Sequence, residues 1–268
     1  MGSACLASAF DRRPSVSQGR KIPSSSILNI DAVTVSFDGF RALNELSLQI
    51  DRGEMRAIIG PNGAGKTTMM DVITGRTVPD LGAVVFDGHL DLLRRDEAEI
   101  AELGIGRKFQ KPTVFEALSV RDNVLIALAG ERGVFANLFS KRPRTADQDV
   151  NRHLETVRLA DFRTVPAGVL SHGQKQWLEI AMLLAQDPKL LLVDEPVAGM
   201  TDAETLQTAE LLVDIARTHS VVVVEHDMEF VRRLGVKVTV LHEGSVLAEG
   251  PLDRVSADER VIEVYLGR

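Results

Sequence analysis

The strongest constraint on the fold is a glycine-rich run at residues 60–67, which reads Gly-Pro-Asn-Gly-Ala-Gly-Lys-Thr. It fits the phosphate-binding pattern G-x-x-x-x-G-K-S/T at every fixed position. Apolar residues 57–59 before it predict the end of a buried strand, and residues 68–73 after it predict the first turns of a helix. Glycines let successive backbone N–H groups turn toward an anion, and the positive end of the following helix points to the same place. The run therefore predicts a binding site for a nucleoside triphosphate.

Two side chains of this loop add chemistry to the backbone cradle. Lys66 offers a full positive charge to the outer phosphates, and the hydroxyl of Thr67 is a candidate ligand for Mg²⁺. The residues expected to contact the nucleotide here are Gly60, Pro61, Asn62, Gly63, Ala64, Gly65, Lys66, Thr67 and Thr68.

Composition limits the classes of function. The 268 residues are 44% hydrophobic, which is enough for one large domain or one domain with a subdomain. The net charge of −7 disfavours a nucleic-acid partner, and the single cysteine, Cys5, excludes an intrachain disulfide. No apolar run approaches the roughly 20 residues of a membrane span, so a role at a membrane would require partner proteins.

Along the chain, residues 1–26 show little periodicity and predict a flexible N-terminal extension, so the folded domain is expected over 27–268. Apolar alternation over 27–50 predicts antiparallel strands, and residues about 94–180 predict a helical subdomain. A hairpin and a short helix at about 256–266 are expected to end the chain. Phe37, beside a turn, is either a core residue or a flat face for stacking on a purine.

Two apolar strands end in acidic or imidazole side chains. Residues 190–193 precede Asp194 and Glu195, and residues 221–224 precede Glu225 and His226. Ligands of parallel sheets lie beyond the carboxyl ends of the strands, which places Asp194 and Glu195 at the phosphates and His226 at the same sheet edge. One of the two acids can hold Mg²⁺ with Thr67 while the other takes a proton from an attacking water. The alternative is that the acids only cap a helix.

A second candidate anion site lies at residues 170–176, which read Leu-Ser-His-Gly-Gln-Lys-Gln. Ser171 is a good N-cap, and Gln174 follows at the position of a capping box. A serine hydroxyl, a glycine N–H and a helix dipole then face one point. The alternative is a capped helix start without a ligand.

The order of these motifs resembles the nucleotide-binding subunit of ATP-binding cassette (ABC) proteins over about residues 27–268. The run LSxGQ ahead of the acidic strand is specific for that family, and no guanine-reading Asn-Lys-x-Asp segment is present. The resemblance implies an α/β fold: a P-loop NTPase core with a RecA-like parallel sheet, an antiparallel β subdomain and an α-helical subdomain. It also implies an ATPase with ATP and Mg²⁺ as ligands.

The resemblance further assigns roles. It makes Lys66, Glu195, His226 and Gln110 the catalytic residues, with Glu195 as general base and His226 at the γ-phosphate. Gln110 would also link the nucleotide state to the helical subdomain, and Phe37 becomes the adenine-stacking ring. The implied Mg²⁺ ligands are Thr67, Gln110 and Asp194.

The family also implies a head-to-tail dimer with two ATP molecules at the interface. Each nucleotide would be held by the loop of one protomer and by the LSHGQ run of the other. The residues expected to hold the partner's nucleotide are Ser171, His172, Gly173 and Gln174. His172 departs from the family, which mostly has glycine there.

The wording of residues 35–43, 170–180, 196–201 and 260–267 resembles the ATPases of branched-chain amino acid importers, and within these the urea-importer ATPase. This implies ATP-driven uptake of urea across the inner membrane, with branched-chain amino acid import as the alternative. Implied partners are two membrane permease subunits, a second ATP-binding subunit (itself or a paralogue) and, indirectly, a periplasmic solute-binding protein. The chain would lie peripherally on the cytoplasmic face. A non-transport cassette ATPase is a second alternative, although such proteins usually carry long coiled coils or two cassettes, which this chain lacks.

Overall fold

The computed structural model describes residues 25–108, 113–129 and 144–266. Gln110 and residues 1–24 of the expected N-terminal extension lie outside the described residues.

A six-stranded sheet, in the order β10-β9-β3-β8-β7-β6, forms the centre of the molecule. The five strands from β9 to β6 pair in parallel, and β10 pairs antiparallel with β9 at the edge. Its strands are β3 (Met55–Ile59), β6 (Ile105–Lys108), β7 (Leu190–Asp194), β8 (Ser220–Val224), β9 (Lys237–His242) and β10 (Ser245–Pro251).

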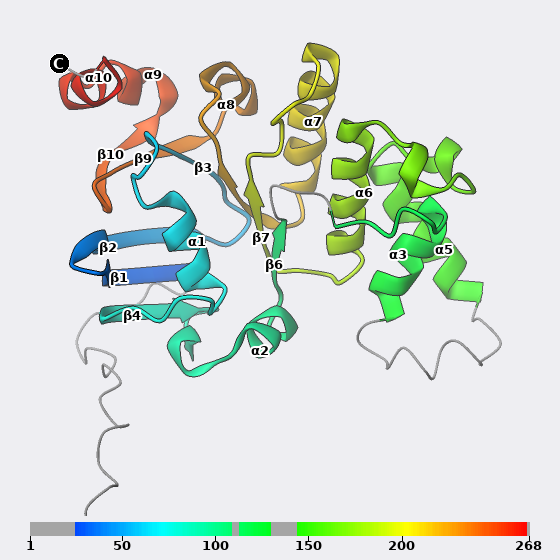
Figure 1. Cartoon of the computed structure of the whole chain (residues 1–268), viewed down its shortest axis with the longest axis horizontal. Helices are drawn as coiled ribbons and strands as arrows, with labels where there is room; N and C mark the ends of the chain where they lie inside the picture. The colour runs from blue at the N-terminus through cyan, green and yellow to red at the C-terminus, as the bar shows by residue number, and fades with distance from the viewer. Residues whose placement is uncertain (1–24, 109–112, 130–143, 267–268) are drawn as a thin grey trace, which may run out of the picture.

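The second sheet is entirely antiparallel, in the order β2-β1-β4-β5. Its strands are β1 (Ser26–Phe37), β2 (Phe40–Asp51), β4 (Leu81–Phe86) and β5 (Leu90–Asp91). β1 and β2 form the hairpin that the alternating pattern predicts, and Figure 1 shows them beside α1.

Helices cover both faces of the central sheet. The first, α1, lies on the side of the antiparallel sheet, whereas α3, α5 and α6 form a lobe on the opposite side of the molecule (Figure 1). The helices are α1 (Lys66–Ile73), α2 (Glu97–Glu102), α3 (Val120–Ala129), α5 (Arg144–Thr156), α6 (His172–Leu184), α7 (Asp202–Ile215), α8 (Met228–Leu234), α9 (Leu252–Ser256) and α10 (Glu259–Leu266). Single 3-10 turns occur at η1 (Leu92–Arg94), η3 (Ala160–Phe162) and η4 (Ala167–Val169).

The strands of the central sheet are buried on both faces, which explains their continuous apolar runs. In β8, Val222 and Val224 pack with α1 and the antiparallel sheet, whereas Val221 and Val223 pack with α6, α7 and α8. Side chains of a strand alternate between its faces, so one valine run contributes to two cores. The architecture confirms the predicted fold class.

The helical subdomain begins later than the expected residue 94. β6 lies within the expected range but pairs in parallel with β7, so it belongs to the central sheet. The C-terminal helix expected at about 256–266 is α10, and the shorter helix α9 lies ahead of it, separated from it by Ala257 and Asp258.

Candidate active site

The glycine-rich loop connects β3 to α1, as predicted, and both elements hold it against the rest of the molecule. All five residues of β3 are buried. Gly65 is the N-cap of α1 with φ of 97°, and a Cβ there would lie 2.6 Å from the carbonyl oxygen of Ala42. No side chain caps α1. The N–H groups of its first turn have no acceptor within the helix, so they fit an anionic ligand.

Lys66 points back over this loop. Its Nζ donates to the carbonyl oxygens of Gly60 and Pro61, at 2.6 and 3.0 Å. Burial lowers the pKa of Lys66, whereas the charges of Glu195, Asp194 and Glu225 oppose that shift. Three carboxylates from two other strand ends therefore lie close enough to act on this ammonium group.

The ends of β7 and β8 place these acids side by side. The backbone N–H of Glu195 donates to the carbonyl of Val224 at 2.9 Å. Glu195 has φ of 44°, in the left-handed region that is uncommon outside glycine and often marks functional sites. Nδ1 of His226 lies 3.5 Å from Oε1 of Glu195 and 3.8 Å from Oε2 of Glu225.

Asp194, the last residue of β7, is buried, and burial raises the pKa of its carboxyl group. The guanidinium of Arg107, on β6, lies 3.7 Å from Oδ2 of Asp194 and also pairs with Asp71 on α1 at 2.5 Å. Arg107 was not singled out from the sequence. Its position at the end of a short strand was the available signal.

Glu225 is the second residue that the sequence reasoning left without a role. Its carboxylate is almost fully buried and accepts hydrogen bonds from the backbone N–H groups of His226, Asp227 and Val197, at 2.9, 3.2 and 3.5 Å. Burial raises the pKa of Glu225 despite these donors. The Glu225 side chain therefore links the segment that follows β7 to the segment that follows β8. An acid at the end of a buried strand, the same signal as for Asp194, could have identified it.

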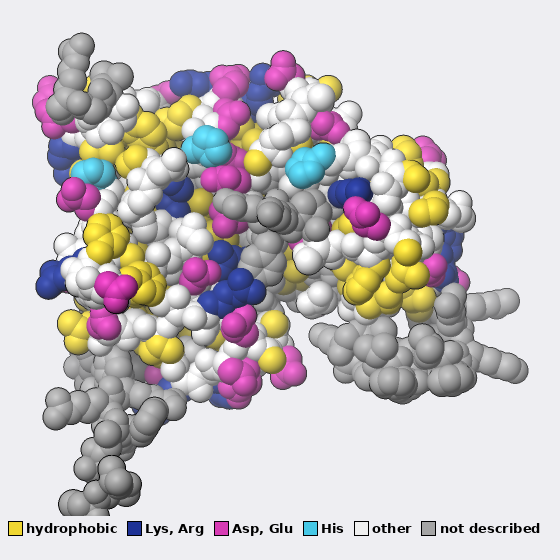
Figure 2. Space-filling view, in the orientation of Figure 1, with side chains coloured by type: hydrophobic (Ala, Val, Ile, Leu, Met, Phe, Trp, Pro, Cys, Tyr) yellow, Lys and Arg dark blue, Asp and Glu magenta, His cyan; other side chains and the backbone are white. Residues whose placement is uncertain are grey.

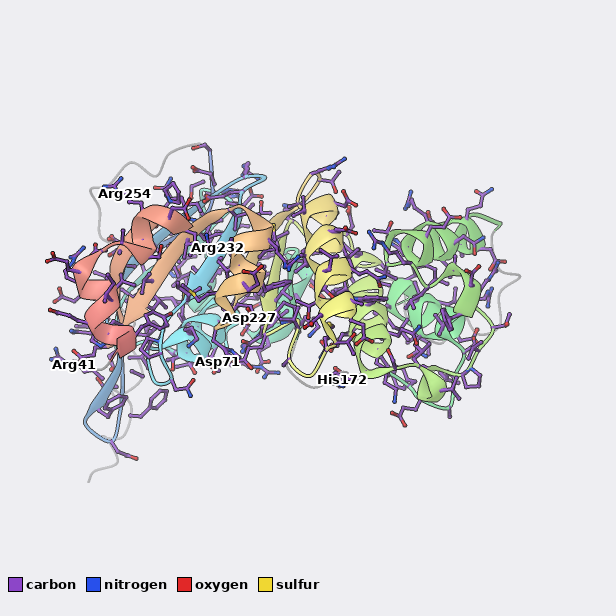
Figure 3. The ribbon with its side chains drawn as sticks, turned by 90° about the horizontal axis from the view of Figure 1, so that it is seen from above. Arg41, Asp71, His172, Asp227, Arg232 and Arg254 are labelled. Carbon is purple, nitrogen blue, oxygen red and sulfur yellow. The ribbon has the colours of Figure 1, made fainter. Side chains whose placement is uncertain are left out.

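The LSHGQ run lies at the start of α6. Ser171 and Gln174 form the predicted capping box: the hydroxyl of Ser171 accepts from the N–H of Gln174, and the Gln174 amide oxygen accepts from the N–H of Ser171. Ser171 and His172 are exposed, and His172 lies 3.2 Å from the amide nitrogen of Gln176. Figure 3 places His172 farther along the molecule, toward the helical lobe, than Asp71 and Asp227 beside the loop.

Phe37 lies at the end of β1, and its side chain is 50% exposed. Of the two roles left open for Phe37, the structure excludes that of a core residue.

Figure 2 shows one face of the molecule, and acidic, basic and histidine side chains lie together over the middle of that face.

In the part of the chain that the structure describes, no group of three His, Cys, Asp or Glu side chains could hold a metal by itself. Mg²⁺ in phosphate-binding sites usually takes only one or two protein carboxylates together with substrate phosphates and water. A hydroxyl at Thr67 and a carboxylate at Asp194 fit that donor set.

Comparison with known proteins gives the family. A sequence model described as ABC transporter matches residues 43–198, which is more than half of the chain. This chain belongs to the ABC transporter ATPase family. A second model, described as branched-chain amino acid ATP-binding cassette transporter, matches residues 245–268 of the same ABC ATPase.

Curated relatives carry related names. The ABC ATPase is 32% identical over 253 residues to the high-affinity branched-chain amino acid transport ATP-binding protein BraF of Pseudomonas aeruginosa, covering 91% of this chain and 99% of the relative. It is 34% identical over 247 residues to the probable branched-chain amino acid transport protein LivG of Archaeoglobus fulgidus, covering 90% and 95%. A phosphate import ATP-binding protein, PstB 2 of Natronomonas pharaonis, is 37% identical over 236 residues, covering 86% and 82%.

Solved structures agree with this placement. A nucleotide-free ATP-binding cassette from an ABC transporter matches with a TM-score of 0.79 and 29% identity, covering 91% of this chain and 100% of the other. A dimeric cassette in a post-hydrolysis state with ADP and phosphate matches with a TM-score of 0.71 and 27% identity, covering 84% and 98%. The ABC ATPase described here therefore binds and hydrolyses ATP. None of its described helices is long and apolar enough to cross a bilayer.

Proposed function

We propose that this ABC ATPase is the ATP-hydrolysing subunit of a membrane importer. The observation that carries the proposal is the gathering of Lys66, Glu195 and His226 at one edge of the central sheet. A cation, a candidate base and an imidazole then face the place where the outer phosphates of ATP would lie.

Each residue has a distinct part in hydrolysis. Lys66 and the uncapped N–H groups of α1 hold the phosphates and stabilise the charge that develops on them. Glu195 accepts a proton from the attacking water, and His226, which is 63% exposed beside it, contacts the γ-phosphate. Phe37 offers an exposed ring for the adenine.

Mg²⁺, when bound, would neutralise negative charge on the phosphates. Thr67 and Asp194 would hold it from this chain, and Gln110, outside the described residues, is the further ligand that the family resemblance implies. Arg107 keeps the Asp194 carboxylate oriented at the end of β7.

The exposed start of α6 is assigned to the nucleotide of a second ATP-binding subunit, either another copy or a paralogue. Ser171, His172, Gly173 and Gln174 would contact the γ-phosphate held by that partner. The dimeric form of a structurally similar cassette supports this pairing.

The helical lobe offers a surface for the two permease subunits. Phe115 and Val169 are 52% and 70% exposed, and backbone hydrogen bonds from Gly168 to Glu116 and from Ala167 to Leu118, both of 2.9 Å, bring their segments together. A contiguous patch of exposed apolar side chains is a common mark of a protein–protein interaction site. Docking here would hold the subunit on the cytoplasmic face of the inner membrane, with a periplasmic solute-binding protein delivering cargo on the other side.

Two cargoes are supported by different observations. Branched-chain amino acids are supported by the names of the relatives and by the match at residues 245–268. Urea is supported by the resemblance of the sequence at residues 170–180 and 260–267 to the urea-importer ATPase. The phosphate importer is as similar in identity as the branched-chain relatives, so identity at this level does not select between cargoes.

The proposal is tested by measuring the uptake of labelled leucine and of labelled urea in cells that lack this gene. The same cells are then complemented with the wild-type chain or with the Glu195→Gln chain. Loss of one uptake, restored only by the wild type, would identify the cargo and the requirement for hydrolysis together. If neither uptake, nor that of any other solute tested, depended on the gene, the importer role would be wrong and a non-transport ATPase would replace it.

A further inference from the structure

The hydroxyl group of Ser171 is engaged by a carboxylate of the same chain. Oγ of Ser171 donates to Oε1 of Glu204, on α7, at 2.8 Å. Oε2 of the same carboxylate accepts from the backbone N–H and the hydroxyl of Thr201, both at 3.0 Å. Both oxygens of Glu204 are therefore bonded, one to its own helix start and one to the start of α6.

The contact with Glu204 occupies the only proton of the Ser171 hydroxyl. A serine hydroxyl has one proton and two lone pairs. The N–H of Gln174 uses one lone pair, at 3.2 Å, and Glu204 takes the only proton. In this arrangement Ser171 has no proton left to donate to a phosphate.

Gly173 lies against the same carboxylate. A Cβ at Gly173 would lie 2.7 Å from Oε1 of Glu204 and 2.8 Å from its Cδ. The absence of a side chain there leaves room for Glu204 as well as an open backbone. The hydrogen bonds from Thr201 and Ser171 lower the pKa of Glu204, so the group is ionised at neutral pH.

We propose that Glu204 is an internal competitor for the partner's γ-phosphate, which holds the Ser171 proton until the two subunits close around ATP. This inference rests on the pairing proposed above. When a phosphate oxygen reaches Ser171, the hydroxyl proton turns from Glu204 to the phosphate, and no covalent bond changes. Glu204 thereby opposes closure, and closing on ATP requires that its hydrogen bond be given up.

Glu204→Gln separates this role from helix capping. A glutamine side chain still accepts from Thr201 through its amide oxygen, as a capping box allows. Its NH₂ group then donates to Oγ of Ser171 and leaves the serine proton available. The substitution removes the competition and keeps the cap.

The test uses the full-length chain carrying Glu195→Gln, so that bound ATP persists, and measures association by sedimentation in Mg-ATP. Adding Glu204→Gln should lower the protein concentration needed for ATP-dependent association about fivefold, the difference between a charged and a neutral hydrogen bond. Glu210→Gln is the matched control, because Glu210 is an exposed acid of the same helix paired with Arg158. It should leave association unchanged.

A second pair of variants tests whether the effect depends on the hydroxyl proton of Ser171. In a Ser171→Ala background, Glu204→Gln should have no effect, because there is no hydroxyl for the carboxylate to hold. If Glu204→Gln strengthened association equally in the Ser171→Ala background, its effect would be general charge repulsion and the proposal would be overturned. The proposal would also be overturned if Glu204→Gln failed to strengthen association, or weakened it, when Ser171 is present. Parent protein that fails to associate in ATP, alone or with its co-expressed second ATP-binding subunit, would instead overturn the pairing itself and the inference with it.

Discussion

Nδ1 of His226 lies 3.5 Å from Oε1 of Glu195, and the two residues follow the ends of adjacent parallel strands. β7 and β8 pair from Leu190 with Ser220 to Asp194 with Val224, so the residues after them emerge together. This register brings a candidate base and an imidazole to one point from positions 31 residues apart in the chain.

Glu195→Gln should abolish turnover and leave ATP binding intact. The amide keeps the shape of the side chain but cannot take a proton from water, and loss of a general base typically lowers kcat about 10²–10⁴-fold. Steady-state ATPase assays and equilibrium ATP binding on the same preparation check both halves. Turnover close to wild type would remove Glu195 from the role of base.

His226→Ala should lower kcat about 10²–10³-fold, the loss found when one group that stabilises transition-state charge is removed. Because His226 is largely exposed, the fold should be unaffected. His242, half-buried at the end of β9, provides a comparison: His242→Ala should retain turnover. Similar losses for both histidines would argue against a specific role for His226.

Asp194→Asn should weaken ATP binding when Mg²⁺ is present and have little effect when the metal is chelated. A neutral amide is a poorer ligand for a hard divalent cation than a carboxylate. Titration with ATP in Mg²⁺ and in EDTA measures the difference directly. Equal weakening under both conditions would indicate a purely structural role beside Arg107.

ATP affinity should fall at alkaline pH because of Lys66. Burial lowers the pKa of this side chain below the ordinary lysine value. The protonated form binds phosphate, so the affinity is full below the pKa of Lys66 and is lost as pH rises through it. The loss should begin at lower pH than for an exposed lysine.

The matched variant is Lys66→Arg, whose guanidinium stays charged throughout this range. Its affinity at neutral pH can differ from that of wild type, but its alkaline decline should be absent. A decline of the same shape in both proteins would assign the effect to another group.

Lys108→Met should destabilise the fold by about 3–5 kcal/mol, the usual result of removing one partner from a buried ion pair. Nζ of Lys108 is fully buried, 3.9 Å from Oε2 of Glu179 on α6, and Glu179 accepts a hydrogen bond of 2.8 Å from the hydroxyl of Thr113. Denaturant unfolding measures the free energy of unfolding.

The double variant Lys108→Met with Glu179→Leu should recover most of that loss, because no unpaired buried charge remains. An exposed pair gives the control: Arg76→Met, which breaks the contact with Glu97, should cost about 0–1 kcal/mol. A Lys108 variant as stable as that control would show that the buried pair contributes nothing.

The phosphate loop and the strand ends could be predicted from the sequence because their signals are local. Glycines at fixed spacing define a backbone shape, and an apolar run followed by an acid defines a strand end wherever the strand pairs. The capping box at Ser171 and Gln174 was predictable for the same reason, since its partners are three residues apart.

Only the tertiary structure decided which distant side chains meet. Arg107 reaches Asp194 across paired strands, Glu225 binds the N–H of Val197 28 residues earlier, and Glu204 meets Ser171 33 residues earlier. It likewise decided that Phe37 is exposed and that the strand β6 belongs to the central sheet. Periodicity specifies which face of an element is apolar. It does not specify which elements become neighbours, because that depends on how the sheets and helices pack against one another.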